Sequence, residues 1–155
     1  MTLQDFGSIG ELIAAIATVA TLAYLAAQIR QNTTSVRAAT FRSYVESAAS
    51  WLSSIYQDAE LTEIWRRGRE DLTSLGEAER ARFSLVLLAH FRITENAYVQ
   101  AQRGLVQETE FQGIRESFIL LIDSPGTRAW WVENASRYST PFRNFVEAEL
   151  RKRAA

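Results

Sequence analysis

Polar side chains suited to chemistry gather in one otherwise apolar stretch, residues 83–101. They are His90, Arg92, Glu95, Asn96 and Tyr98. The histidine is the side chain best able to transfer a proton near neutral pH, and the other groups could orient a polar ligand. One interpretation is therefore a polar pocket in an enzyme or a ligand-binding domain.

The spacing of these residues favours a structural role instead. A carboxylate-bridged metal pair would need Glu three residues before His90, and that residue is Leu87. No other helical neighbour of His90 is a metal ligand or a strong acid, so we expect a core histidine. Arg92 and Glu95 stand three residues apart, as an ion pair on a helix does. With Asn96 they are expected to tie helices together.

The composition of the chain excludes several other kinds of functional site. The chain of 155 residues has no cysteine, which excludes disulfides, thiolate metal sites and thiol catalysis. Its net charge is -1, and it has neither a glycine-rich phosphate loop nor a basic surface with interleaved aromatics. We expect no catalytic residue, no metal site, no cofactor and no nucleic-acid partner.

The dominant feature is an apolar segment, residues 9–29. No charged side chain stands between Glu11 and Arg30. A helix over that gap would be roughly 27 Å long, close to the hydrocarbon thickness of a bilayer. The sequence therefore predicts a single transmembrane helix, with residues 1–33 as the membrane anchor. A buried helix of a soluble bundle and a signal sequence are the alternatives, although no basic residue precedes the apolar run.

The two sides of this helix differ in side-chain size. Its large apolar residues are Leu12, Ile13, Ile16, Val19, Leu22 and Ile29, and we expect them to face lipid. The small and polar side comprises Gly10, Glu11, Ala14, Ala17, Thr18, Thr21 and Gln28. Small residues at a spacing of four let helix backbones approach closely, so this side is the predicted helix–helix contact in the membrane.

Charges flanking the apolar segment predict its orientation. Asp5 precedes it and no base does, whereas Arg30, Arg37 and Arg42 follow it before the first acid, Glu46. Positive residues stay on the cytoplasmic side of single spans. The C-terminal domain, residues 34–155, is therefore expected in the cytoplasm.

That domain has the pattern of a small helical bundle. Apolar residues recur at helical spacing over residues 36–57, 77–103 and 107–122, with shorter helices around residues 61–65, 129–132 and 142–150. Asp58 and the Ser74–Glu77 pair are predicted N-terminal caps, Gly104 a C-terminal cap, and Pro125 a first helical residue. The polar run 31–35 either kinks the first helix or continues it. No segment alternates as a strand, so the fold class is all-α.

Two exposed-looking clusters are candidate contacts with lipid or a partner. One is basic and lies beside a tryptophan: Trp65, Arg66, Arg67 and Arg69. The other is the pair Trp130 and Trp131. Adjacent helical residues point about 100° apart, so we expect one indole in the core and the other nearer the surface.

Several segments resemble an uncharacterised bacterial family. Its members have an N-terminal hydrophobic helix that ends in Gln-Ile-Arg-Gln-Asn-Thr, as residues 28–33 do here, followed by a small helical domain. Residues 64–68, 95–100 and 126–131 fit the same type. The resemblance implies a bacterial membrane-anchored helical protein and carries no site residues. With the C-terminal domain in the cytoplasm, the expected location is the inner membrane.

Three functions follow as hypotheses. The first is a membrane-anchored interaction module that contacts lipid and either forms a homo-oligomer or joins other membrane protein subunits. The second is a homo-oligomeric pore lined by Glu11, Thr18, Thr21 and Gln28. The third is a ligand-binding or enzymatic domain with its pocket near His90.

Overall fold

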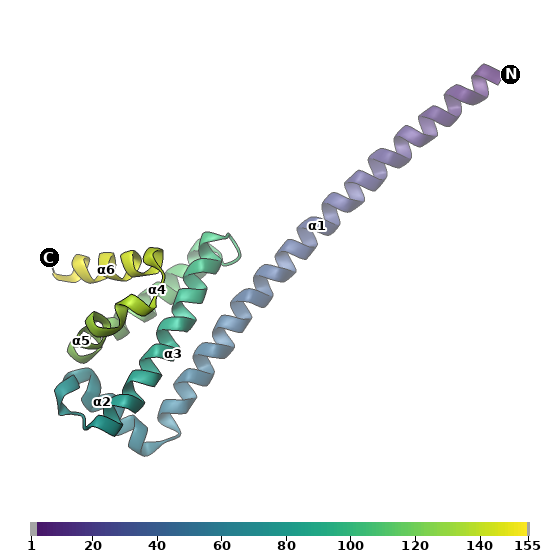
Figure 1. Cartoon of the computed structure of the whole chain (residues 1–155). Helices are drawn as coiled ribbons and strands as arrows, with labels where there is room; N and C mark the ends of the chain where they lie inside the picture. Colours follow the sequence, from purple (N-terminus) through teal and green to yellow (C-terminus); the bar gives the residue numbers. More distant parts are fainter. Residues whose placement is uncertain (1–2, 155) are drawn as a thin grey trace. The chain divides into compact units, whose positions relative to one another are not determined.

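The computed structural model describes residues 3–154, with side chains placed for residues 10, 11 and 13–153. Over these residues the chain forms six α-helices and two short 3₁₀ helices, without a strand (Figure 1). The elements are α1 (Leu3–Tyr56), α2 (Ala59–Glu70), η1 (Leu72–Ser74), α3 (Glu77–Gln102), α4 (Glu108–Ile122), α5 (Pro125–Asn134), η2 (Ala135–Arg137) and α6 (Thr140–Ala154). The predicted all-α fold is confirmed: one long apolar N-terminal helix precedes a helical bundle.

The chain divides into two compact units, Met1–Ala39 and Thr40–Ala155. In the first unit the polar run 31–35 continues α1 without a break. Thr33 Oγ1 donates to the Ile29 carbonyl at 2.9 Å, and Thr34 Oγ1 donates to the Arg30 carbonyl at 3.1 Å. The hydroxyls are therefore satisfied by their own helix and need no turn.

The second unit is built around an aromatic core. Phe91 of α3 lies at its centre, with its ring centroid 5.0 Å from that of Phe118 and 5.1 Å from that of Trp130. Phe142 of α6 and Ile64 of α2 are also fully buried in this cluster. Each helix of the unit thus contributes a large apolar side chain to one shared interior.

Glycine allows α2 and α5 to come into backbone contact. A Cβ atom built on Gly126 would lie 1.7 Å from the carbonyl oxygen of Gly68, far inside van der Waals distance. No residue with a side chain fits at position 126 unless the two helices move apart.

Most of the predicted helix ends are confirmed. Asp58 caps α2 by accepting a hydrogen bond from the Leu61 N–H at 3.0 Å. Gly104 follows α3 with a φ of 69°, and Pro125 is the first residue of α5. Each of these signals acts within one turn of the chain, so neighbouring elements do not alter it.

The predicted capping pair of Ser74 and Glu77 is wrong. Gly76 is the N-terminal cap of α3, and the Glu79 carboxylate accepts the hydrogen bond from its N–H at 2.9 Å. Ser74 belongs to the 3₁₀ turn η1, where its hydroxyl donates to the Asp71 carbonyl at 2.7 Å. That turn uses the hydroxyl before α3 begins.

Candidate functional site

The apolar segment of α1 is exposed along its length. Its large side chains are 61–66% exposed, namely Ile13, Ile16, Val19, Leu22 and Ile29. Ile13–Tyr56 is long enough, and apolar enough over an 18-residue window with mean hydropathy 1.5, to cross a membrane. None of that window is buried among the described residues. The expected lipid-facing position of Leu12 lies outside the described side chains.

The small and polar side of the same helix is also exposed. Nothing lies within 4 Å of a Cβ atom built on Gly10, and Glu11, Ala14, Ala17 and Gln28 are exposed as well. Thr18 Oγ1 donates to the Ala14 carbonyl at 2.9 Å, and Thr21 Oγ1 donates to the Ala17 carbonyl at 2.8 Å. Both hydroxyls therefore bond within their own helix.

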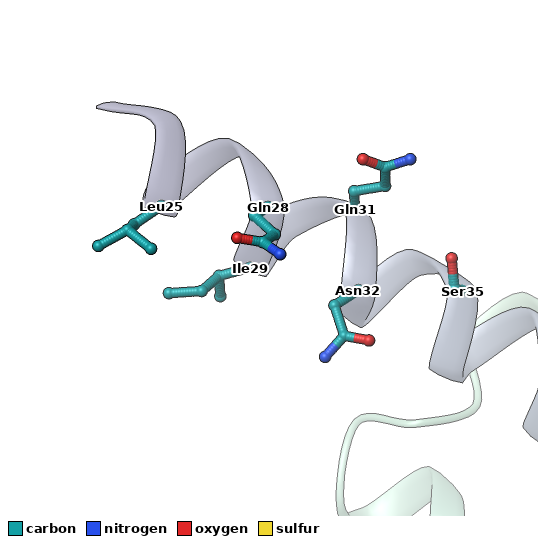
Figure 2. Close-up of a pocket in the computed structure, with 6 residues that line it drawn as sticks. All are labelled: Leu25, Gln28, Ile29, Gln31, Asn32 and Ser35. Carbon is teal, nitrogen blue, oxygen red and sulfur yellow. The ribbon is translucent and has the colours of Figure 1, made fainter. Parts of the chain in front are cut away.

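A shallow hollow runs along α1 at residues 25–35. Figure 2 shows Leu25, Ile29 and Asn32 projecting from one side of the helix, while Gln31 and Ser35 project from the other. All the side chains around it belong to one helix and are exposed. The hollow therefore has no second wall that could enclose a ligand.

The five residues of the predicted polar pocket are divided among different places. The imidazole of His90 faces the rings of Trp51, at a centroid distance of 4.1 Å, and Phe118, at 6.1 Å. Tyr98 instead packs on Phe145, at 5.1 Å, in a separate hollow. The structure thus does not bring His90 and Tyr98 together.

Arg92 and Glu95 form the expected network between helices. Their side chains pair at 2.7 Å. Arg92 also donates to the Arg137 carbonyl at 2.8 Å, and Glu95 accepts from the Ser139 N–H at 2.9 Å. Both contacts tie α3 to the segment that precedes α6, which confirms the structural interpretation. Among the described residues, the Asn96 side chain accepts a long hydrogen bond, 3.4 Å, from Gln100 on its own helix and is not part of this network.

A groove within the second unit is lined mainly by apolar side chains and by His90. It has a volume of about 590 Å³. We call it the α1–α4 groove, and its lining residues are Tyr44, Val45, Ala48, Ala49, Trp51, Leu52, Trp65, Arg69, His90, Ser117, Leu120 and Leu121. Leu52 is 54% exposed and Leu120 is 69% exposed, so its walls present apolar surface to solvent.

His90 is the buried polar group of this groove. It is only 8% exposed, and its Nδ1 atom has no hydrogen-bond partner among the described residues. Burial lowers the pKa of the imidazole to about 4, so the ring is neutral at pH 7. A neutral imidazole has one N–H to donate and one nitrogen to accept.

Arg69 supplies the groove with a positive charge. Its guanidinium lies 5.8 Å from the centroid of the Trp65 ring and donates to the Leu120 carbonyl at 3.3 Å. Its Nε atom is buried without a partner, and no described carboxylate pairs with it. The other arginines of the predicted basic cluster differ: Arg66 bonds Glu63 and Glu70, and Arg67 pairs with Glu79.

Trp130 and Trp131 are both buried, so the expectation that one indole lies near the surface is wrong. They are 1% and 4% exposed. Phe91 packs against both rings, and Trp130 Nε1 donates to Ser84 Oγ at 2.8 Å. The cause is that α5 is covered on two sides, by α3 and by the segment carrying Tyr138, whose ring lies 5.3 Å from Trp131. Neither tryptophan is available to lipid or to a partner.

Most residues of the α1–α4 groove were not predicted from the sequence. Leu120 carried the available signal, because it is a large apolar residue off the stripe of α4 that enters the core. Val45 and Leu52 on α1 are exposed in the same way. Whether these exposed residues line a groove depends on which helices lie beside them, and residue spacing within one helix does not show this.

No protein-family model matches this chain, and neither does any curated protein or solved structure.

Proposed function

We propose that the protein is a membrane-anchored helical interaction module of a bacterial inner membrane. Residues 1–33 form its single span, and residues 34–155 form its cytoplasmic domain. The observation that carries this proposal is the exposure of the large apolar side chains from Ile13 to Ile29 on one continuous helix. Each such side chain favours insertion into a bilayer by about 0.3–0.6 kcal/mol, so together they favour moving the segment out of water.

The flanking charges support the orientation. Arg30, Arg37 and Arg42 follow the apolar segment, and no base precedes it. Retention of positive residues on the cytoplasmic side would leave the aromatic-cored bundle in the cytoplasm.

The small side of the helix supports association with a second membrane helix. Gly10, Ala14 and Thr18 offer little side-chain bulk, and the Thr18 hydroxyl is already bonded to its own helix. Without a hydrophobic driving force inside lipid, close packing of such surfaces is what holds helices together. We infer a homo-oligomer, or an accessory subunit bound to another membrane protein.

The anchor is tested by carbonate extraction of fractionated cells. The protein is expected to stay in the membrane pellet at alkaline pH, and its release as a soluble protein would contradict the proposal. Orientation is tested on single-cysteine variants, since the native chain has no cysteine. A membrane-impermeant maleimide should label Ser8→Cys from the periplasm and should reach Ser50→Cys only after lysis.

Association is tested by crosslinking and mass measurement in mild detergent. Ala14→Leu and Thr18→Leu should weaken the complex at least tenfold, because they add bulk to the proposed contact. Ile13→Leu and Val19→Leu, on the other side, are matched controls that should leave it unchanged. A strictly monomeric wild-type protein that recovers no crosslinked partner would exclude the association.

A further inference from the structure

We propose that the α1–α4 groove binds a long-chain fatty acid, with its acyl chain along the apolar walls and its carboxylate at Arg69 and His90. This inference concerns the second unit alone and does not depend on the membrane anchor.

The walls of the groove match an acyl chain. Val45 and Leu52 of α1 and Leu120 of α4 are exposed, and Leu121 and the ring of Trp51 extend the same apolar lining. The volume of about 590 Å³ lies within the range of small-molecule sites. Ala48 and Ala49 also line the groove and add little bulk to its α1 wall.

Two side chains of the groove, His90 and Arg69, match a carboxylate. Buried polar groups in native proteins are nearly always hydrogen-bonded, yet His90 Nδ1 and Arg69 Nε have no partner among the described residues. The Arg69 charge also lacks a described acid partner. A carboxylate accepts from a guanidinium and from an imidazole N–H, and its negative charge offsets that of Arg69. Because His90 Nδ1 and Arg69 Nε are closed to solvent, small rotations of these side chains would have to open them to the carboxylate.

A slender ligand fits this arrangement better than a folded partner. The imidazole is only 8% exposed. A helix with its side chains is about 10–12 Å wide, so its backbone would stay at the rim and only a single side chain of it could reach His90. A single acyl chain can enter the groove and carry its own carboxylate to His90 and Arg69.

The test is photolabelling of the full-length protein in nanodiscs. The probe is a palmitic acid analogue with a diazirine in its chain, and adducts are mapped by mass spectrometry. Labels are expected within residues 44–52 and 117–121. Unlabelled oleate should compete for them at least tenfold better than oleyl alcohol, which has the same chain without the carboxylate.

Two variants and two matched controls locate the site. Ala48→Phe fills the groove and Arg69→Gln removes its charge, so each should reduce labelling at least tenfold. Ala81→Phe, on an exposed face of α3, and Arg66→Gln, on the same helix as Arg69, should not change it. Circular dichroism checks that every variant is folded, and Arg69→Gln is the milder of the two groove changes.

Three results would overturn the proposal. Labelling confined to the apolar segment of α1 would indicate only lipid partitioning. Equal competition by oleyl alcohol, or labelling unchanged in both groove variants, would remove the carboxylate site. A disulfide-linked dimer of Leu120→Cys, formed without any labelling of the groove, would assign this surface to a second copy of the chain.

Discussion

The indole ring of Trp51 and the imidazole ring of His90 lie with their centroids 4.1 Å apart and their planes at 39°. Trp51 Nε1 also donates to the Val86 carbonyl, at 2.9 Å, one turn before His90 on α3. One tryptophan thus fixes the last turns of α1 to α3 through a hydrogen bond and a ring contact. The same contact shields the imidazole from water, and this burial lowers its pKa.

Stability should fall as the pH falls through the titration range of His90. The pKa of the folded imidazole is lowered to about 4, so below pH 6.5 the unfolded chain takes up a proton that the folded chain does not. The free energy of unfolding should therefore decrease by roughly 3 kcal/mol between pH 6.5 and pH 4 from this group. Guanidinium unfolding of the detergent-solubilised chain, followed by tryptophan fluorescence, measures it.

The control for this prediction is His90→Phe, which keeps a ring beside Trp51 and removes the titration. Carboxylates contribute equally to both proteins, so the variant should lose less stability than the wild type over the same pH range. Parallel pH profiles would show that the imidazole is not shielded.

Gly126→Ala should be among the most damaging small substitutions. The added methyl would overlap the Gly68 carbonyl oxygen at 1.7 Å, and backbone cannot rotate away as a side chain can. Separating α2 from α5 should lower the free energy of unfolding by roughly 3 kcal/mol or more.

Gly113→Ala is the matched control, because nothing lies within 4 Å of its Cβ position in the middle of α4. There alanine should stabilise the helix by about 0.5–1 kcal/mol through its higher helix propensity. Thermal unfolding of both variants gives the comparison, and equal midpoints would contradict the close approach of α2 and α5.

Ser84→Ala should destabilise the protein, because it removes the acceptor of the Trp130 indole N–H. The hydroxyl accepts from the Trp130 indole N–H at 2.8 Å, and that indole is fully buried. Leaving a buried donor unpaired should lower the free energy of unfolding by about 1–3 kcal/mol.

Ser47→Ala serves as its control, because the Ser47 hydroxyl is exposed and only bonds the Ser43 carbonyl of its own helix. It should change the unfolding midpoint little. If both variants melt alike, the Trp130 hydrogen bond does not contribute to stability.

Val19→Arg should release the protein from the membrane. Arginine at the centre of a spanning helix opposes insertion by about 2.5–3.5 kcal/mol, and the apolar residues of this segment have little surplus to offset it. Alkaline extraction should move most of the variant from the membrane pellet into the soluble fraction. Gln31→Arg, beyond the apolar run, should stay in the pellet, and retention of Val19→Arg would argue against a span.

The features that the sequence by itself determined are local ones. The uncharged run from residue 12 to residue 29 specifies an apolar helix, because hydropathy adds along the chain without regard to neighbours. Asp58, Gly104 and Pro125 mark helix ends through hydrogen bonds and φ preferences that act within one turn. The Arg92–Glu95 pair follows from helical spacing in the same way.

Only the tertiary structure decided which faces are covered. Trp130 and Trp131 point in different directions, and both are buried because α5 has neighbours on two sides. His90 and Arg69 come from different helices and meet the same groove only when α1, α2, α3 and α4 are assembled. Helical periodicity gives the direction of each side chain about its own axis, but the distance and angle between helices depend on packing that involves the whole core, as the contact of Gly126 with Gly68 shows.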